Sequence, residues 1–401
     1  MHVSSLELEE FRLYQRLSLS ISPAGLRIIG QNATGKSTLV EAIALLATMR
    51  SPRTGSDREL IRWESGKELG FPPYARAIGH VSASNQETVI EVDLQIDPLG
   101  ESTLRKTVKI NGRPVRAIDA VGRLRVVLFA PEDVALISGP PSGRRRYLDL
   151  LISQVDSRYV RTLARYNRIV EQRNSLLKSF KGASSHANGG AVTNQLSFWN
   201  DELVTYGSYL VTRRRLVCAG LAERVVARFN EFSSGGDLGI HYQGTVGGEV
   251  TDESLMAADR EIAHERIQRA FETQLAEVRP DELRRGVSLI GPHRDDFDVL
   301  LNGMPVGTYG SRGQQRLAVV ALKLAEADQM RHEARESPVI LLDDVLSELD
   351  ATHRERLLAG ACSTGAQLVL TSTDAQMLEQ EALRSIPMVR VAPGEIEEVS
   401  G

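Results

Sequence analysis

A phosphate-binding loop stands near the start of the chain, where the sequence follows the pattern GxxxxGKS through Gly30, Gln31, Asn32, Ala33, Thr34, Gly35, Lys36 and Ser37. In such a loop, backbone N–H groups surround the phosphates of a nucleotide and the lysine contacts the β- and γ-phosphates. The serine hydroxyl is a ligand of Mg²⁺, and the N-terminus of the following helix adds its dipole. We therefore predict a nucleotide site formed by residues 30–37, and Thr38 belongs to the same candidate set.

The flanks of this loop have the pattern that its chemistry requires. Leu26, Ile28 and Ile29 form a short apolar run before Gly30, typical of a buried strand, and residues 39–46 have apolar positions at helical spacing. The alternative is a glycine-rich turn that precedes Lys36 by chance. Such a turn would not require a strand before it and a helix after it, whereas the sequence has both patterns.

Two adjacent carboxylates follow a second apolar run near the other end of the chain. Residues 338–342 read as a buried strand, and Asp343 and Asp344 come directly after it, which is the form of a Walker B strand. Asp343 would hold Mg²⁺ through water, and Asp344 stands where a second carboxylate could orient an attacking water. Residues 346–350 then resemble the D-loop of ABC-type ATPases, which is a dimer contact.

A third motif precedes the carboxylates, because residues 311–316 (SRGQQR) run into a helical pattern that extends to Ala334. A serine hydroxyl and a glycine N–H at the start of a helix form an anion site. In ABC-type ATPases this signature motif meets the γ-phosphate that the phosphate loop of the other subunit holds. We therefore predict an ATP-dependent homodimer, in which the contacts across the interface come from Ser311, Arg312, Gly313 and Gln314. A polar helix cap is the alternative.

The elements that position these motifs predict an α/β fold. Period-two patterns at residues 3–11, 89–96 and 104–110 indicate an antiparallel sheet, whereas residues 126–129, 339–342 and 367–370 read as buried core strands. Between them, residues 148–177 and 196–221 have apolar positions three and four residues apart, which predicts two amphipathic helices joined by a flexible tip at 182–190. We expect a P-loop ABC-type ATPase head built from both chain ends, with an inserted α-helical lever-arm domain. The predicted domains are residues 1–139, 140–285 and 286–401.

Composition limits the classes of protein that remain. The 401 residues include 48 basic and 52 acidic side chains, so the net charge of −4 does not indicate nucleic acid, and a DNA surface would have to be local. The two cysteines, Cys218 and Cys362, exclude a thiolate metal cluster and provide no disulfide framework. No run approaches 18 uninterrupted apolar residues, so we expect a cytoplasmic protein without a membrane partner.

The order of the motifs resembles the RecF family of SMC-like ABC ATPases. Besides the loop, signature and Asp343–Asp344 strand, the resemblance rests on residues 11–14 (FRLY), 130–141 (APEDVALISGPP), 144–149 (RRRYLD), 171–177 (EQRNSLL) and 291–297 (GPHRDDF). It implies a weak, DNA-stimulated ATPase that takes ATP and Mg²⁺ and binds single- and double-stranded DNA and junctions as a dimer. The implied partners are RecO and RecR and, indirectly, RecA at gaps. The implied roles are recombinational repair, replication and the SOS response.

Three positions bear on catalysis within this resemblance. Asp344 stands where ABC ATPases usually have glutamate, and Thr373 stands where transporter ATPases have a switch histidine, so we expect slow hydrolysis. Lys36 and Asp344 are the candidate catalytic residues. Arg12 could approach the nucleotide from the N-terminal hairpin, as matching residues do in SMC-like heads, or it is a solvated strand residue.

The direct sequence signal for DNA binding is weak. Arg213, Arg214 and Arg215 cluster in the second predicted arm helix and are the candidate DNA contacts, while further basic residues lie along residues 144–178. Solvated helix faces are the alternative, and Arg144 to Arg146 could instead anchor the arm. The His293, Asp295 and Asp296 group could suggest a metal site, but with Arg294 beside these residues a structural turn fits better.

Two other functional classes share part of this pattern. A transporter ATPase subunit would carry a short helical subdomain and the switch histidine, which the sequence lacks. A purely structural SMC-like clamp would need long coiled coils, whereas each predicted arm helix has about 30 residues and a length of roughly 45 Å.

Overall fold

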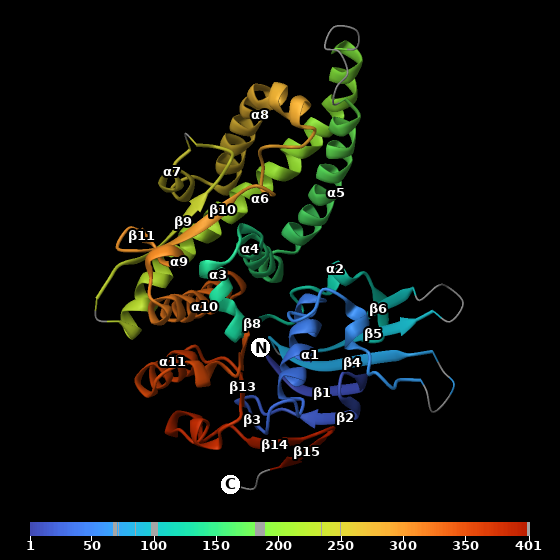
Figure 1. Cartoon of the computed structure of the whole chain (residues 1–401), viewed down its shortest axis with the longest axis vertical. Coiled ribbons are helices and arrows are strands. Elements are labelled where there is room, and N and C mark those ends of the chain that lie inside the picture. The colour runs from blue at the N-terminus through green and yellow to red at the C-terminus, as the bar shows by residue number, and fades with distance from the viewer. Residues whose placement is uncertain are drawn as a thin grey trace. The chain divides into compact units, whose positions relative to one another are not determined.

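The computed structural model describes residues 1–66, 70, 72–84, 86–97, 103–180, 189–233, 235–248 and 250–398. Contacts divide the chain into two compact units (Figure 1). The first, here called the head unit, contains Met1–Val134, Arg228–Ser234 and Val319–Gly401. The second, the helical unit, contains Ala135–Ala227 and Gly235–Ala318. The three domains predicted from the sequence have other limits, since this grouping puts residues 286–318 with the helical unit.

A mainly parallel sheet forms one layer of the head unit. Its strand order is β15-β14-β3-β13-β12-β8, with β3 (Gly25–Ile29), β8 (Val126–Phe129), β12 (Val339–Asp343), β13 (Leu368–Ser372), β14 (Met388–Ala392) and β15 (Glu395–Glu398). The central pairs β8·β12, β12·β13 and β13·β3 are parallel, and their apolar side chains are buried except for the partly buried Leu128. The predicted core strands are therefore confirmed, and strands from both ends of the chain are interleaved in one sheet.

The second layer of the head unit is an antiparallel sheet in the order β2-β1-β4-β5-β6-β7. It contains β1 (His2–Phe11), β2 (Tyr14–Ser20), β4 (Tyr74–Ala83), β5 (Gln86–Ile96), β6 (Leu104–Ile110) and β7 (Arg113–Val115). A turn at Asn111 and Gly112 joins β6 to β7, and both residues have positive φ (51° and 75°), as type I′ hairpin turns require.

Helix α1 (Lys36–Thr48) packs against both sheets of the head unit. Almost all its residues are buried, and the antiparallel sheet makes room for them at Gly79 of β4. A Cβ atom at Gly79 would lie 2.8 Å from the side chain of Leu46. The helix that follows the phosphate loop is thus held from two sides.

Further short elements complete the head unit. They are α2 (Ala117–Ala120), α11 (Ala351–Ser363) and the 3₁₀ turns η1 (Asp57–Leu60), η2 (Pro131–Val134), η3 (Val345–Glu348), η4 (Ala375–Met377) and η5 (Glu381–Leu383). Helix α10 (Arg312–Ala334) begins in the helical unit and continues into the head unit.

The helical unit contains more than the predicted helix pair. Its helices are α3 (Ala135–Ser138), α4 (Pro141–Val155), α5 (Ser157–Phe180), α6 (Gly189–Phe232), α7 (Asp252–Met256), α8 (Arg260–Arg285) and α9 (Val306–Tyr309). The end of α6 from Arg228 onward is grouped with the head unit. The unit also contains a small sheet in the order β11-β10-β9, formed by β9 (Leu238–Gln243), β10 (Asp296–Leu301) and β11 (Met304–Pro305). The tip predicted at 182–190 lies mostly outside the described residues.

The first predicted arm helix is in fact two helices, so the expectation of one continuous helix was wrong. Helix α4 ends at Val155, and α5 begins at Ser157. Between them, Asp156 accepts hydrogen bonds from the backbone N–H groups of Arg158 and Tyr159, both at 3.0 Å. An aspartate that caps a new helix start breaks the helix without breaking the apolar spacing, so periodicity alone could not show the break.

Among the described residues, no helix is both long enough and apolar enough to cross a lipid bilayer.

Candidate nucleotide-binding site

The phosphate loop joins β3 to α1 and needs its glycines. Gly35 has φ +111°, and a Cβ atom there would lie 2.8 Å from the Tyr14 hydroxyl. A Cβ atom at Gly30 would lie 2.5 Å from the carbonyl oxygen of Val391. Ala33 also has positive φ, at 64°. The loop therefore has the tight conformation in which backbone N–H groups can surround an anion.

The Lys36 side chain folds back over this loop. Its ammonium donates to the carbonyl oxygens of Gly30 and Gln31, each at 2.7 Å. Burial lowers the pKa of Lys36, and the nearby carboxylates of Asp344 and Asp343 oppose that shift. An ammonium has three donors, so these two bonds leave one for a phosphate oxygen, or one bond can be exchanged.

The Ser37 hydroxyl meets the Walker B strand inside the head unit. It donates to Asp343 Oδ1 at 2.7 Å, although the two residues are 306 positions apart. A hydroxyl and a carboxylate are both hard oxygen ligands, the type that Mg²⁺ prefers beside substrate phosphates. The residues predicted to hold the metal are thus brought together, and their chemistry fits Mg²⁺.

Thr371, which the sequence reasoning missed, ties the two Walker B carboxylates to the next strand. Its hydroxyl donates to Asp343 Oδ1 at 2.9 Å and accepts from the backbone N–H of Asp344, also at 2.9 Å. Thr371 lies on β13 and is buried. The apolar pattern of β13 predicted a buried strand but did not indicate that one of its positions contacts the site.

Asp344 has the features of a reactive carboxylate. Its backbone is in the left-handed region, with φ +54°. Its Oδ1 atom is buried and has no hydrogen-bond partner among the described residues. Burial raises its pKa, Lys36 counteracts the shift, and Asp343 and Glu348 add to it. A buried carboxylate oxygen without a partner is costly for folding alone, but it is available to a water or a substrate.

Arg12 forms an ion pair with the helix that follows the loop. Arg12 Nη2 lies 2.7 Å from Glu41 Oε1, and Arg12 Nε donates to Glu41 Oε2 at 3.0 Å. Ser51 donates a further hydrogen bond to the same buried carboxylate, at 2.5 Å. Arg12 itself has φ +54° and a partly exposed side chain. The pair places Arg12 against α1, while its contact with a nucleotide stays a prediction.

The signature motif forms the start of α10. The hydroxyl of Ser311 accepts from the N–H of Gln314 at 3.2 Å, and Gln314 Oε1 accepts from the N–H of Ser311 at 2.8 Å. These reciprocal bonds are a capping box. Residues 311–314 are exposed, and a Cβ atom at Gly313 would meet only Ser311 Oγ, at 3.9 Å. The cap is present, and the predicted contact across a dimer stays a prediction.

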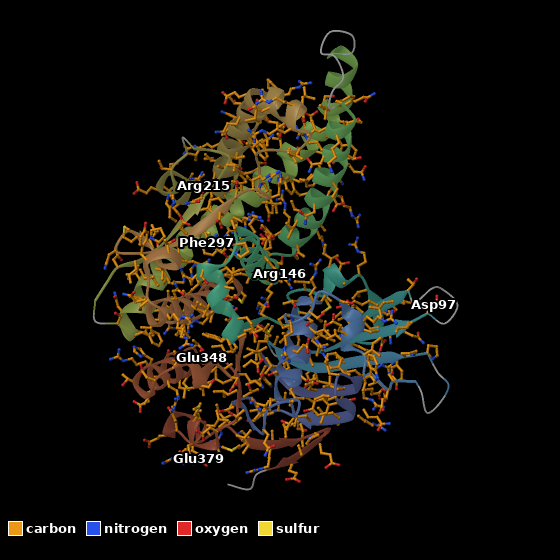
Figure 2. The ribbon with its side chains drawn as sticks, viewed as in Figure 1. Asp97, Arg146, Arg215, Phe297, Glu348 and Glu379 are labelled. Atoms are coloured by element: carbon orange, nitrogen blue, oxygen red, sulfur yellow. The ribbon has the colours of Figure 1, made fainter. Side chains whose placement is uncertain are left out.

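The segment predicted as a D-loop forms η3 and the cap of α11. Asp350 accepts from the His353 N–H at 3.0 Å, and Arg354 donates to the carbonyl oxygens of Leu346 and Leu349. Figure 2 labels Glu348 within this segment of the head unit. Its turn is therefore held by its own hydrogen bonds.

The arginines predicted to contact DNA are engaged inside the helical unit. Arg213 donates to Asp156 at 2.9 Å, and Arg214 donates to Asp149 at 2.7 Å. Both are buried, with 5% and 2% exposure, so the prediction that Arg213 and Arg214 contact DNA was wrong. Arg215, labelled in Figure 2, donates to the backbone carbonyls of Gly247 and Val250. Three consecutive positions on a helix point in different directions, and α6 is covered on several sides here.

The group around His293 is a structural turn. Asp296 forms an ion pair with Arg144 at 2.7 Å, and His293 Nδ1 shares a hydrogen bond with the Tyr166 hydroxyl at 2.8 Å. Asp295 is buried and accepts from Tyr242 at 2.6 Å. Throughout the described ranges, no cluster of three or more His, Cys, Asp or Glu side chains could hold a metal.

The comparisons agree with the geometry of the head unit. A family model described as the RecF/RecN/SMC N terminal domain matches residues 2–395. The "DNA replication and repair protein RecF" of Thermomicrobium roseum is 44% identical over 402 residues, covering 99% of this chain and 100% of the relative. That of Roseiflexus castenholzii is 42% identical, with 99% of each chain covered.

Solved structures give the same result for the fold. The structure described as "the recombination mediator protein RecF-ATP in RecFOR pathway" superposes with a TM-score of 0.83 at 28% identity, covering 100% of this chain and 98% of that chain. An SMC head bound to the C-winged helix domain of ScpA is similar in fold, with a TM-score of 0.52, 15% identity and coverage of 100% and 98%. With a matching family model and full-length relatives above 40% identity, the chain belongs to the RecF family of DNA replication and repair proteins.

Proposed function

We propose that this chain is an ATP-dependent DNA-binding switch of recombinational repair and replication. The observation that carries the proposal is the 2.7 Å hydrogen bond between Ser37 of the phosphate loop and Asp343 of the Walker B strand. It joins two motifs from opposite ends of the chain, and in P-loop ATPases these motifs share one Mg²⁺.

The head unit would bind ATP through residues 30–38, with Lys36 directed to the β- and γ-phosphates. Ser37 and Asp343 would hold Mg²⁺, which when bound neutralises charge on the phosphate oxygens. Asp344 would orient the attacking water, since its Oδ1 is buried and has no partner among the described residues. A side chain one methylene shorter than glutamate reaches less far, which supports weak hydrolysis. We infer from family membership that DNA stimulates this hydrolysis.

The dimer follows from the signature motif. Ser311 to Gln314 are exposed at the start of a helix, where a hydroxyl and backbone N–H groups can receive the γ-phosphate of a nucleotide held by a second copy. ATP would then join two copies of the chain, whereas ADP lacks the phosphate that the motif needs.

The biological roles rest on family membership. We infer that the ATP-bound dimer binds single- and double-stranded DNA and junctions, and that it acts with RecO and RecR to promote RecA loading at gaps. It would thereby serve repair, replication and the SOS response. We place this work in the cytoplasm, where the DNA substrate lies.

Sedimentation in the presence of each nucleotide tests the proposal. We expect MgATP to convert monomer to dimer and MgADP to leave the monomer. Lys36→Met should abolish ATP binding and dimerisation together, because it removes the charge that faces the phosphates. Ser311→Ala should bind ATP normally and fail to dimerise.

Two results would contradict this scheme. Equal dimerisation with ADP would remove the role of the γ-phosphate in the interface. Normal dimerisation of Ser311→Ala, Gly313→Ala and the double variant would show that the signature motif is only a helix cap. The conservative change Ser311→Thr keeps the hydroxyl and serves as the control.

A further inference from the structure

Helix α5 carries four exposed arginines on one face. Arg158, Arg161, Arg165 and Arg168 are three, four and three residues apart, which is the spacing of neighbours on a helix surface. The buried positions of α5 lie on a different side, at Tyr159, Thr162, Tyr166, Ile169, Arg173 and Leu177. We call the four exposed residues the arginine face.

Two of these arginines stack on tyrosines of α6. The guanidinium carbon of Arg158 lies 4.3 Å from the centre of the Tyr209 ring, and that of Arg165 lies 4.6 Å from the centre of the Tyr206 ring. A stacked guanidinium keeps the N–H donors along its edge available. Stacking also restricts the side chain before any partner arrives, which reduces the entropy lost on binding.

Carboxylates lie beside part of the arginine face. On α5, Glu171 follows Arg168 by three residues, which makes the two side chains neighbours on the helix surface. On α6, Glu202 forms an ion pair with Arg165 at 2.5 Å. The Arg165 side chain is still 56% exposed in that pair. An exposed pair of this kind contributes little stability, so a second anion can compete for the arginine.

We propose that the arginine face binds the phosphate backbone of duplex DNA, an inference that rests on the proposed function and locates its DNA surface. From Arg158 to Arg168 the face extends about 15 Å along the helix. One DNA strand carries about four phosphates over that length, at ~3.4 Å per phosphate. Guanidinium groups bind phosphate through two parallel hydrogen bonds. Such contacts are independent of base sequence.

The test compares two variants that change the charge of this surface in opposite directions. Dissociation constants for a fluorescein-labelled duplex of mixed sequence would be measured at several salt concentrations, with MgATP and the full chain. Replacing all four arginines with glutamine should lower the slope of log K against log salt by up to about 3.6 per bound copy. Glu202→Gln should tighten binding and steepen the slope, because Arg165 would lose its competing carboxylate.

A matched control comes from α8 of the same unit. Arg260, Arg266, Arg269 and Arg284 are exposed, so their replacement with glutamine removes the same charge from another helix. We expect that variant to keep most of the affinity and slope. If both quadruple variants lost the same affinity and slope, the arginine face would not be the DNA surface, and the effect would come only from the overall change in charge. If folding of the first variant fails by circular dichroism, Arg168→Gln and Glu202→Gln still have to shift affinity in opposite directions.

The inference and the proposed function fail in different ways. If the unaltered chain does not bind the duplex with MgATP, the proposed DNA-binding function is wrong. If it binds and the arginine-face variants bind with unchanged affinity and slope, the function stands and the arginine face is a solvated surface or contacts a protein instead.

Discussion

Thr371 offers the sharpest test of the candidate site. Its hydroxyl both donates to Asp343 and accepts from the N–H of Asp344, each at 2.9 Å. Thr371→Val keeps the branched shape that the buried strand β13 packs, but it removes both hydrogen bonds. The change therefore affects how the two carboxylates are held rather than the volume of the core.

The expected size of the effect follows from these two bonds. The partly buried N–H of Asp344 would lose its partner, which costs about 1–3 kcal/mol. Residues that orient metal ligands typically change metal affinity or activity by about 10- to 100-fold when they are replaced. We therefore expect the Mg²⁺ concentration for half-maximal ATP hydrolysis to rise, or kcat to fall, by about 10- to 100-fold.

Steady-state phosphate release measures this directly. Hydrolysis would be followed against Mg²⁺ concentration at saturating ATP for the unaltered chain, Thr371→Val and Thr371→Ser. The serine variant retains the hydroxyl and should stay close to the unaltered chain. ATP binding in the absence of metal should change little in all three, since Lys36 and the loop are untouched.

Normal kcat and normal Mg²⁺ dependence of Thr371→Val would show that the Thr371 hydroxyl does not hold the two carboxylates in place. A serine variant as defective as the valine variant would show that the methyl group, and so core packing, determines the effect. Thermal unfolding of each variant separates a local defect from a general loss of structure.

Three further outcomes follow from the structure. Asp344→Asn should keep ATP binding and dimerisation while turnover falls, and normal turnover of the variant would mean that another residue is the catalytic carboxylate. Because burial raises the pKa of Asp344, kcat of the unaltered chain should fall at acidic pH with a midpoint above the usual aspartate pKa. Arg173 donates to buried Glu282 at 2.5 Å, so Arg173→Met should lower the free energy of unfolding of the helical unit, measured in urea, by about 3–5 kcal/mol. The double variant with Glu282→Leu should regain much of that stability, and a double variant whose loss equals the sum of the two single losses would contradict this. Burial lowers the pKa of His293 to about 4, below its value in the unfolded chain, so stability should be lost as pH falls from about 6.5 towards 4, by about 2 kcal/mol at pH 5. The stability of His293→Gln should not depend on pH in this way.

The last two measurements need a probe that reports on the helical unit alone, because two compact units need not unfold together. The chain has two tryptophans, Trp63 in the head unit and Trp199 on α6 in the helical unit. Trp63 is 89% exposed, so Trp63→Phe should cost little. Trp199 fluorescence then follows the helical unit, next to Asn200, which accepts a hydrogen bond from Arg173 at 2.9 Å.

Local sequence patterns were enough to predict the nucleotide loop, the paired carboxylates and most strands of the head unit. These features depend on local requirements, such as glycines in a tight turn, a lysine and a serine at set spacing, and apolar alternation along a strand. A local requirement leaves a local pattern, so residues 30–37 and β12 could be predicted without any tertiary contact.

The contacts between side chains far apart in the chain could not be predicted from such patterns and became known from the folded structure. Arg213 and Arg214 had the pattern of a basic patch, yet their partners Asp156 and Asp149 bury them. Thr371 had the pattern of an ordinary buried strand, yet it contacts both Walker B residues. The sequence pattern around a charged side chain is the same whether that side chain faces water or pairs with a carboxylate far away in the chain. The free energy that separates these two cases comes from desolvation and pairing, which exist only once the chain has folded.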